Sequence, residues 1–110
     1  MTPQSVGTLV AMKEEAIKRR SLGRLYTIKA LIDLGRGWHT SGEVMSWLKP
    51  YTHTNYVFEV AGRWPELVEI RAPNKEVRIR PDAFSAASKS IDKVIEEVDQ
   101  SVNAQRRNLY

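Results

Sequence analysis

Residues 66–80 read ELVEIRAPNKEVRIR, two short alternating segments joined by a polar link. In 66–71 and in 76–80 the apolar residues recur at every second position, which is the spacing that places side chains on one face of a β-strand. The link APNK combines Pro and Asn, both of which favour turns. The stretch therefore predicts a β-hairpin. Its apolar face would consist of Val68, Ile70, Val77 and Ile79, and its charged face of Glu69, Arg71, Arg78 and Arg80.

Two short helices are predicted directly before the hairpin. Thr40 and Glu43 have the spacing of a capping box, so the first of these helices should run over 41–49 and end before Pro50. The second should run over 55–62, with Thr52 or Thr54 as its cap. Its inward residues would be Val57, Val60 and Ala61. Trp38 and His39 are expected to form a very short strand, and the tryptophans Trp38, Trp47 and Trp64 are expected to fill the core.

The first third of the chain predicts two further helices, over 5–20 and 24–34. The first is expected to start at Ser5 and to end on the basic run Lys18-Arg19-Arg20, which suits the negative end of a helix dipole. Its predicted apolar face would carry Val6, Leu9, Val10, Ala16 and Ile17. The second has apolar residues at helical spacing and ends at the glycines of the segment 35–37.

A long helix is predicted after Pro81. Its apolar positions are three or four residues apart, close to the heptad repeat of a coiled coil. At about 1.5 Å per residue, 25 such residues span roughly 38 Å, longer than a domain of this size is wide. We therefore expect this helix to pair with a second copy of the chain, with folding back over the first helix as the alternative. The predicted dimer interface consists of Phe84, Ile91, Val94, Val98, Val102 and Leu109.

The order of elements over 24–81 resembles a winged helix-turn-helix domain. The resemblance rests on SGEVMSWLKPYTHTNYVFEVAGRWPELVEIRAPNKEVRIRP, residues 41–81, and the core of the domain covers about half of the chain. It implies a mainly α fold with a two-stranded β-wing. On this view residues 1–81 form a winged-helix domain with an extra N-terminal helix, and residues 82–110 form a dimerisation helix. Helices on both sides of the core resemble those of dimeric regulators of the multiple-antibiotic-resistance and phenolic-acid types.

The resemblance implies a homodimeric transcriptional regulator that binds duplex DNA. In such domains the helix after the turn, here 54–63, enters the major groove, and the wing, here 71–80, reaches the neighbouring backbone or minor groove. The DNA-binding residues implied in this way are Arg19, Arg20, Arg24, His53, Thr54, Asn55, Arg63, Arg71, Lys75, Arg78 and Arg80.

Other hypotheses stay open beside DNA reading. The predicted reading helix is almost neutral and contains Glu59, which suits a protein–protein assembly module. Non-specific binding of single-stranded or chromosomal nucleic acid is a further alternative, resting on the aromatic residues of 51–64. In the simplest interpretation Arg78 or Arg80 pairs with Glu69 across the strands, and the run 18–20 only complements a helix dipole.

Composition narrows the class of protein. The chain has 110 residues with 17 Lys and Arg, 13 Asp and Glu and no cysteine, a net charge of +4. The absence of cysteine excludes disulfides, thiolate metal sites and thiol catalysis. His39 and His53 lack metal-ligand spacing, and no nucleophile–base pair is recognisable, so we expect no enzyme, metal or cofactor. No apolar run approaches about 18 residues, and the N-terminus does not resemble a signal peptide, so a cytoplasmic protein is expected.

Overall fold

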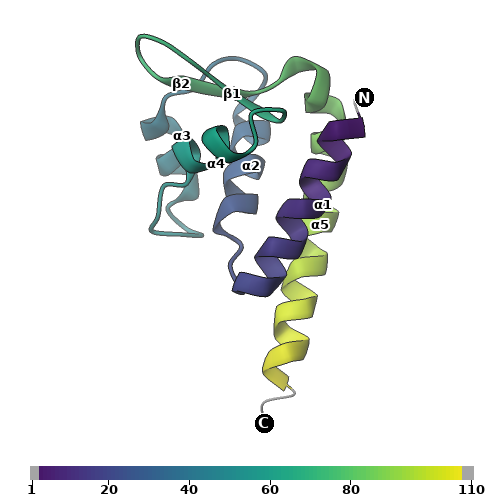
Figure 1. The fold of residues 1–110 in the computed structure, drawn as a ribbon. Helices are drawn as coiled ribbons and strands as arrows, with labels where there is room; N and C mark the ends of the chain where they lie inside the picture. Colours follow the sequence, from purple (N-terminus) through teal and green to yellow (C-terminus); the bar gives the residue numbers. More distant parts are fainter. Residues whose placement is uncertain (1–2, 108–110) are drawn as a thin grey trace.

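The computed structural model describes residues 3–107, and the side chains of residues 7–105. The chain is mainly helical with one two-stranded antiparallel sheet, as predicted (Figure 1). In order, the elements are α1 (Pro3–Arg19), α2 (Gly23–Leu34), α3 (Ser41–Leu48), α4 (Val57–Arg63), β1 (Val68–Arg71), β2 (Glu76–Ile79) and α5 (Pro81–Arg107). None of these described helices has the length and apolar character that crossing a membrane requires.

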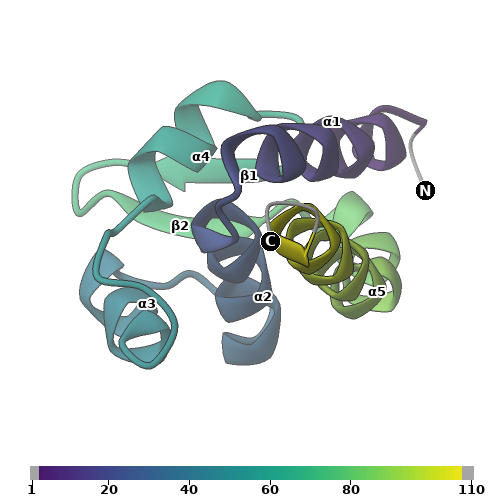
Figure 2. The same ribbon diagram turned by 90° about the horizontal axis from the view of Figure 1, so that it is seen from below.

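The helices form two groups around α2. On one side α1 and α5 lie next to each other, and α5 continues past the end of α1 (Figures 1 and 2). On the other side lie α3, α4 and the hairpin formed by β1 and β2. Between them α2 contacts α1, α3, α4, α5 and β2, and its Leu25, Ile28 and Leu31 are fully buried. The central position of α2 therefore joins both groups into one core.

The hairpin is built as its sequence predicts, with one exception. Val68 pairs with Ile79 and Ile70 pairs with Val77, and the main chain of His39 bonds to Val77 from the other side at 2.9 and 2.8 Å. This bridge confirms the very short strand predicted at His39. Ile70, however, is 46% exposed. It lies near the turn on β1, which is the outer strand because the His39 segment covers β2 instead.

The predicted dimer residues of the last helix are buried inside the chain. Ile91, Val98 and Val102 belong to the core that α5 forms with α1 and α2. The chain's own helices cover these three side chains, as the alternative of folding back over the first helix foresaw, so they present no exposed surface to a second copy. Phe84 and Val94 are half-buried, with the Arg36 guanidinium 4.3 Å from the centre of the Phe84 ring. Leu109 lies outside the described residues, and homodimerisation itself stays a prediction.

The helix boundaries show which local signals were correct. The capping box is confirmed, since the main-chain N–H of Glu43 donates to Thr40 Oγ1 at 3.2 Å. The first helix starts at Pro3, so Ser5 lies within it and does not cap it. On the predicted apolar face of that helix Val10 is exposed, and Met12 is buried instead.

The helix α4 begins at Val57 rather than at residue 55. The Asn55 side chain lies before it and accepts a hydrogen bond from the N–H of Val57 at 2.9 Å. Neither predicted threonine caps the helix, because Tyr56 occupies the cap position. Thr52 Oγ1 instead accepts a hydrogen bond from the N–H of Thr54 at 3.2 Å. The polar residues before α4 therefore shape the loop that leads into the helix.

Replacing Gly23 with alanine should destabilise the protein through Tyr56, the residue before α4. An added Cβ at Gly23 would lie 2.2 Å from Tyr56 Cε2, so the ring must move. We expect Gly23→Ala to lower the free energy of unfolding by about 1–3 kcal/mol, as overpacking does, in a urea titration. At Gly42 a Cβ would meet only Thr40 Oγ1, at 3.8 Å, so Gly42→Ala is the control. Equal stability of the two variants would contradict this packing.

Candidate nucleic-acid interface

One side of α4 faces the core and the other faces solvent. Its buried residues are Val57, Val60 and Ala61, and its exposed residues are Phe58, Glu59, Gly62 and Arg63. Residues four apart lie above one another on a helix, so the exposed side has two stripes. Glu59 and Arg63 form the stripe next to α1 and α2, whereas Phe58 and Gly62 form the stripe next to the hairpin. Charged groups border both stripes.

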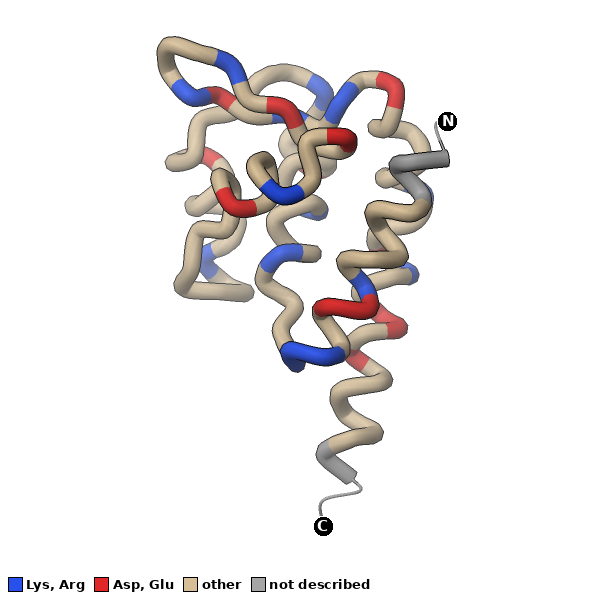
Figure 3. The backbone as a smooth tube through the Cα atoms, in the orientation of Figure 1, with Lys and Arg blue, Asp and Glu red and all other residues tan. Residues whose placement is uncertain are grey.

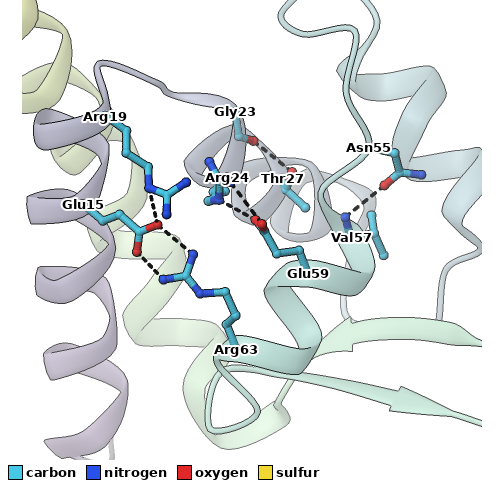
Figure 4. Close-up of polar contacts among 9 residues, drawn as sticks. All are labelled: Glu15, Arg19, Gly23, Arg24, Thr27, Asn55, Val57, Glu59 and Arg63. Carbon is cyan, nitrogen blue, oxygen red and sulfur yellow. Dashed lines mark hydrogen bonds and ion pairs between the residues drawn. The ribbon is translucent and has the colours of Figure 1, made fainter.

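Next to α1, a single carboxylate joins two arginines. Arg63 donates from Nη1 and Nη2 to the two oxygens of Glu15, at 2.7 and 2.5 Å, and Arg19 Nε lies 3.0 Å from Glu15 Oε1 (Figure 4). The hydrogen bonds from Arg63 lower the pKa of Glu15, although partial burial opposes them. Glu15 is therefore ionised at neutral pH and holds the end of α4 against α1.

Next to α2, a second bidentate ion pair fixes the middle of α4. Arg24 donates from Nε and Nη2 to the two oxygens of Glu59, with Nη2 at 3.1 Å (Figure 4). Its guanidinium also lies over the Tyr56 ring, 4.5 Å from the centroid. The hydrogen bonds between them raise the pKa of Arg24 and lower that of Glu59. Both charges are kept at neutral pH, and both polar side chains on the exposed side of α4 already have partners.

The arginines of the hairpin are paired as the simplest interpretation of the sequence expected. Glu69 accepts from Arg78 at 2.5 Å and from Arg80 at 3.3 Å, and Arg71 pairs with Glu76 at 2.9 Å. Arg80 Nε also donates to the carbonyl of Pro65 at 2.5 Å. These three arginines outnumber the two glutamates, so the hairpin is positively charged, and its guanidinium groups are held in place.

Lys75 is the one hairpin base with no carboxylate partner among the described residues. It lies in the turn, in the left-handed region at φ 52. Its Nζ lies 5.9 Å from the centre of the Phe58 ring on α4. Lys75 therefore brings a free positive charge to the hairpin side of α4.

The remaining predicted DNA-binding residues do not all lie near α4. His53 and Thr54 are exposed in the loop before α4. Asn55 is occupied in shaping that loop, as described above. Arg20 donates from Nε to Gln105 Oε1 at 3.0 Å, so its side chain lies against α5 rather than α4. The structure thus gathers Arg19, Arg24 and Arg63 beside α4, and it places Arg20 apart from them.

Three features of this surface were missed at the level of sequence. Glu15 joins α1 to α4, and only its spacing from Arg19 gave any signal. Phe58 is 44% exposed on α4. Trp38, expected in the core, is half-buried with the guanidinium groups of Arg71 and Arg78 at 4.5 and 4.3 Å from its ring. Trp47 is also only half-buried, whereas Trp64 is buried as expected.

The bases lie on both sides of α4. The basic end of α1 and start of α2 lie at one side, and the hairpin lies at the other (Figure 3). Near the first group a shallow hollow is lined by Ala11, Glu14, Glu15, Lys18, Arg19 and Arg63. Among the described residues no three His, Cys, Asp or Glu side chains gather as metal ligands do. Positively charged side chains therefore border the exposed side of α4 at the α1–α2 junction and at the hairpin.

Comparison with known proteins gives no relative. No protein-family model, curated protein or solved structure matches the chain significantly.

Proposed function

We propose that this chain is a winged-helix protein that binds duplex DNA, with a role in regulating transcription. In this proposal α3 and α4 are the helix-turn-helix, α4 faces the major groove, and the β1–β2 hairpin is the wing. The observation that carries it is the exposed side of α4 between two sets of bases, at the α1–α2 junction and on the hairpin. The bridge of His39 to β2, directly before α3, also fits the order of elements in such domains.

The ion pairs around α4 are compatible with phosphate binding. A bidentate arginine fork fits phosphate oxygens as well as carboxylate oxygens. Glu15 and Glu59 hold Arg63 and Arg24 in extended, oriented positions at the border of the exposed surface. DNA phosphates can then exchange with these carboxylates at low cost in side-chain entropy. Because the middle of α4 is neutral, most of the affinity would come from backbone contacts at its two borders.

Binding should be strongly salt-dependent, and Lys75 should account for part of that dependence. We expect anisotropy titrations of a labelled duplex to give a linear fall of log K with log salt, with a slope of about −0.9 per phosphate contact. Lys75→Ala should weaken binding to every sequence and make the slope shallower by about 1. Lys89→Ala should change neither, because it removes an exposed lysine of α5, the helix that lies on the opposite side of α2 from α4 and the hairpin (Figure 2). An absence of binding at low salt, or equal effects of the two variants, would refute the proposal.

A protein–protein assembly module is the second candidate. The observation in its favour is exposed apolar surface, Phe58 on α4 and Ile70 on β1, close to the same face. A module of this kind would not bind duplex DNA in the titration above. Salt-dependent DNA binding reduced by Lys75→Ala would instead favour the first proposal.

A further inference from the structure

The polar side chains of α4 are not available to read base edges. Glu59 is held by Arg24, and Arg63 is held by Glu15. Asn55, just before the helix, already accepts a hydrogen bond from the N–H of Val57. A base edge is neutral, so a hydrogen bond to it would not compensate for the loss of these charge-assisted contacts, whereas a charged phosphate can replace the carboxylate. The exposed surface of α4 that remains available to a binding partner is therefore apolar.

Phe58 provides this apolar surface. It is 44% exposed. Among the described residues, the one aromatic or cation–π interaction of its ring is with the ammonium group of Lys75. One turn further along the same stripe is Gly62, where an added Cβ would meet no atom of the chain within 4 Å. A partner can therefore approach the backbone of α4 closely beside the ring.

We propose that Phe58 contacts the C5-methyl groups of thymine in the major groove, so that the chain prefers A·T base pairs through apolar contact. This inference rests on the DNA-binding function proposed above. The thymine methyl is the apolar group among the base edges of the major groove, and aromatic side chains are among those that contact it. Lys75 beside the ring supplies a cation for a neighbouring phosphate.

The surroundings of Phe58 favour DNA over a protein as the occupant. The exposed apolar side chains near α4 are Phe58 on the helix and Ile70 on β1, the strand that packs against it. A stable protein interface buries about 800 Å² on each partner around an apolar core, and two exposed apolar side chains would form only a small part of such a core. Four bases, Arg19, Arg24, Arg63 and Lys75, border this surface with two acids, Glu15 and Glu59, so its excess of positive charge complements a polyanion.

The experiment compares two duplexes that differ only in methyl groups. One is an alternating A·T duplex, and in the other every thymine is replaced by deoxyuracil, which forms the same base pair without the C5-methyl. Both are titrated by anisotropy at one low salt concentration with the wild-type chain, Phe58→Ala and Phe58→Leu. We expect the wild type to bind the deoxyuracil duplex about fourfold more weakly for each thymine methyl that it contacts. This factor is the usual contribution to affinity of burying one methyl or methylene group.

The variants separate a direct contact from an indirect effect. Phe58→Ala should bind both duplexes with equal affinity, at or slightly below the affinity of the wild type for the deoxyuracil duplex. Phe58→Leu should still bind the thymine duplex more tightly than the deoxyuracil duplex, but by a smaller factor than the wild type. Circular dichroism checks that each variant is folded. As a converse test, 5-methylcytosine should strengthen wild-type binding to a G·C duplex, because its methyl occupies the same position in the groove.

Each outcome has one meaning. A wild type that binds both duplexes equally, or a Phe58→Ala variant that discriminates as well as the wild type, overturns the role of Phe58 while leaving DNA binding intact. A wild type that binds no duplex at low salt refutes the proposed function and the role of Phe58 together.

Discussion

The Ile91→Ala variant is expected to lose about 2–5 kcal/mol of unfolding free energy, as buried isoleucine-to-alanine replacements do. Ile91 is 2% exposed and lies where α5 packs against the first two helices. Removing its outer carbons would leave a cavity in the core of the chain. Urea titrations followed by circular dichroism measure the loss, and the difference from the wild type should be the same at every protein concentration, because both sides of the packed contact belong to one chain.

Ile70→Ala is the matched control, the same substitution at an isoleucine that is 46% exposed. It should cost well under half as much as Ile91→Ala, since partial exposure leaves less contact to lose. If the effect of Ile91→Ala instead grew with dilution, the residue would face a second copy of the chain and the intramolecular packing would be wrong. Comparable losses in the two variants would contradict the burial of Ile91 as well.

The outcome for α5 shows what a repeat pattern specifies. Apolar residues three and four apart indicate that one helix packs along another, and the pattern is the same whether that helix belongs to another chain or to this one. The length of α5 did not by itself require a second chain either, because α1, a helix of 17 residues, lies along it. The hairpin and the capping box around Thr40 were predictable, since neighbouring residues decide both.

The composition of the candidate interface was predictable, and so was the pairing of Glu69 within the hairpin, but the ion pairs between helices were not. Lysines and arginines near α4 and on the hairpin could be named from the sequence. The partners of Arg24 and Arg63 could not, because Glu59 and Glu15 are 35 and 48 residues away along the chain. The exposure of Phe58 was equally hidden, since 57, 58, 60 and 61 are all apolar. Packing against α2 and β1 decides which of them turns outward.

Replacing the two partners of the Arg24–Glu59 ion pair should change DNA affinity in opposite directions. Under the proposed function, Arg24→Ala should weaken DNA binding about 10- to 100-fold, because it removes a phosphate contact and leaves an unpaired carboxylate at the interface. Glu59→Gln should strengthen binding about fivefold, the equivalent of about 1 kcal/mol of repulsion between a carboxylate and a phosphate in near contact in water. Anisotropy titrations at one salt concentration measure both effects.

Stability, unlike DNA affinity, should fall in both variants. Both variants break the same partly exposed ion pair, so each should lower the free energy of unfolding, by about 1 kcal/mol or less. Because Arg24 lowers the pKa of Glu59 in the folded chain, the contribution of the pair is present above the usual glutamate pKa and is lost as pH falls through the lowered value. Thermal denaturation below about pH 4.3 should therefore show a smaller acid loss in Glu59→Gln than in the wild type.

The pair between Lys29 and Asp92 provides the matched control. It joins α2 to α5 as the first pair joins α2 to α4, and hydrogen bonding to Asp92 raises the pKa of Lys29. Lys29→Ala and Asp92→Asn should each cost a similar small amount of stability and should leave DNA affinity nearly unchanged, because this pair lies on the α5 side of α2. Opposite changes in affinity at Arg24 and Glu59, with none at Lys29 and Asp92, require that the anion bind at α4. Parallel losses of affinity at all four positions would mean that the variants act only through stability.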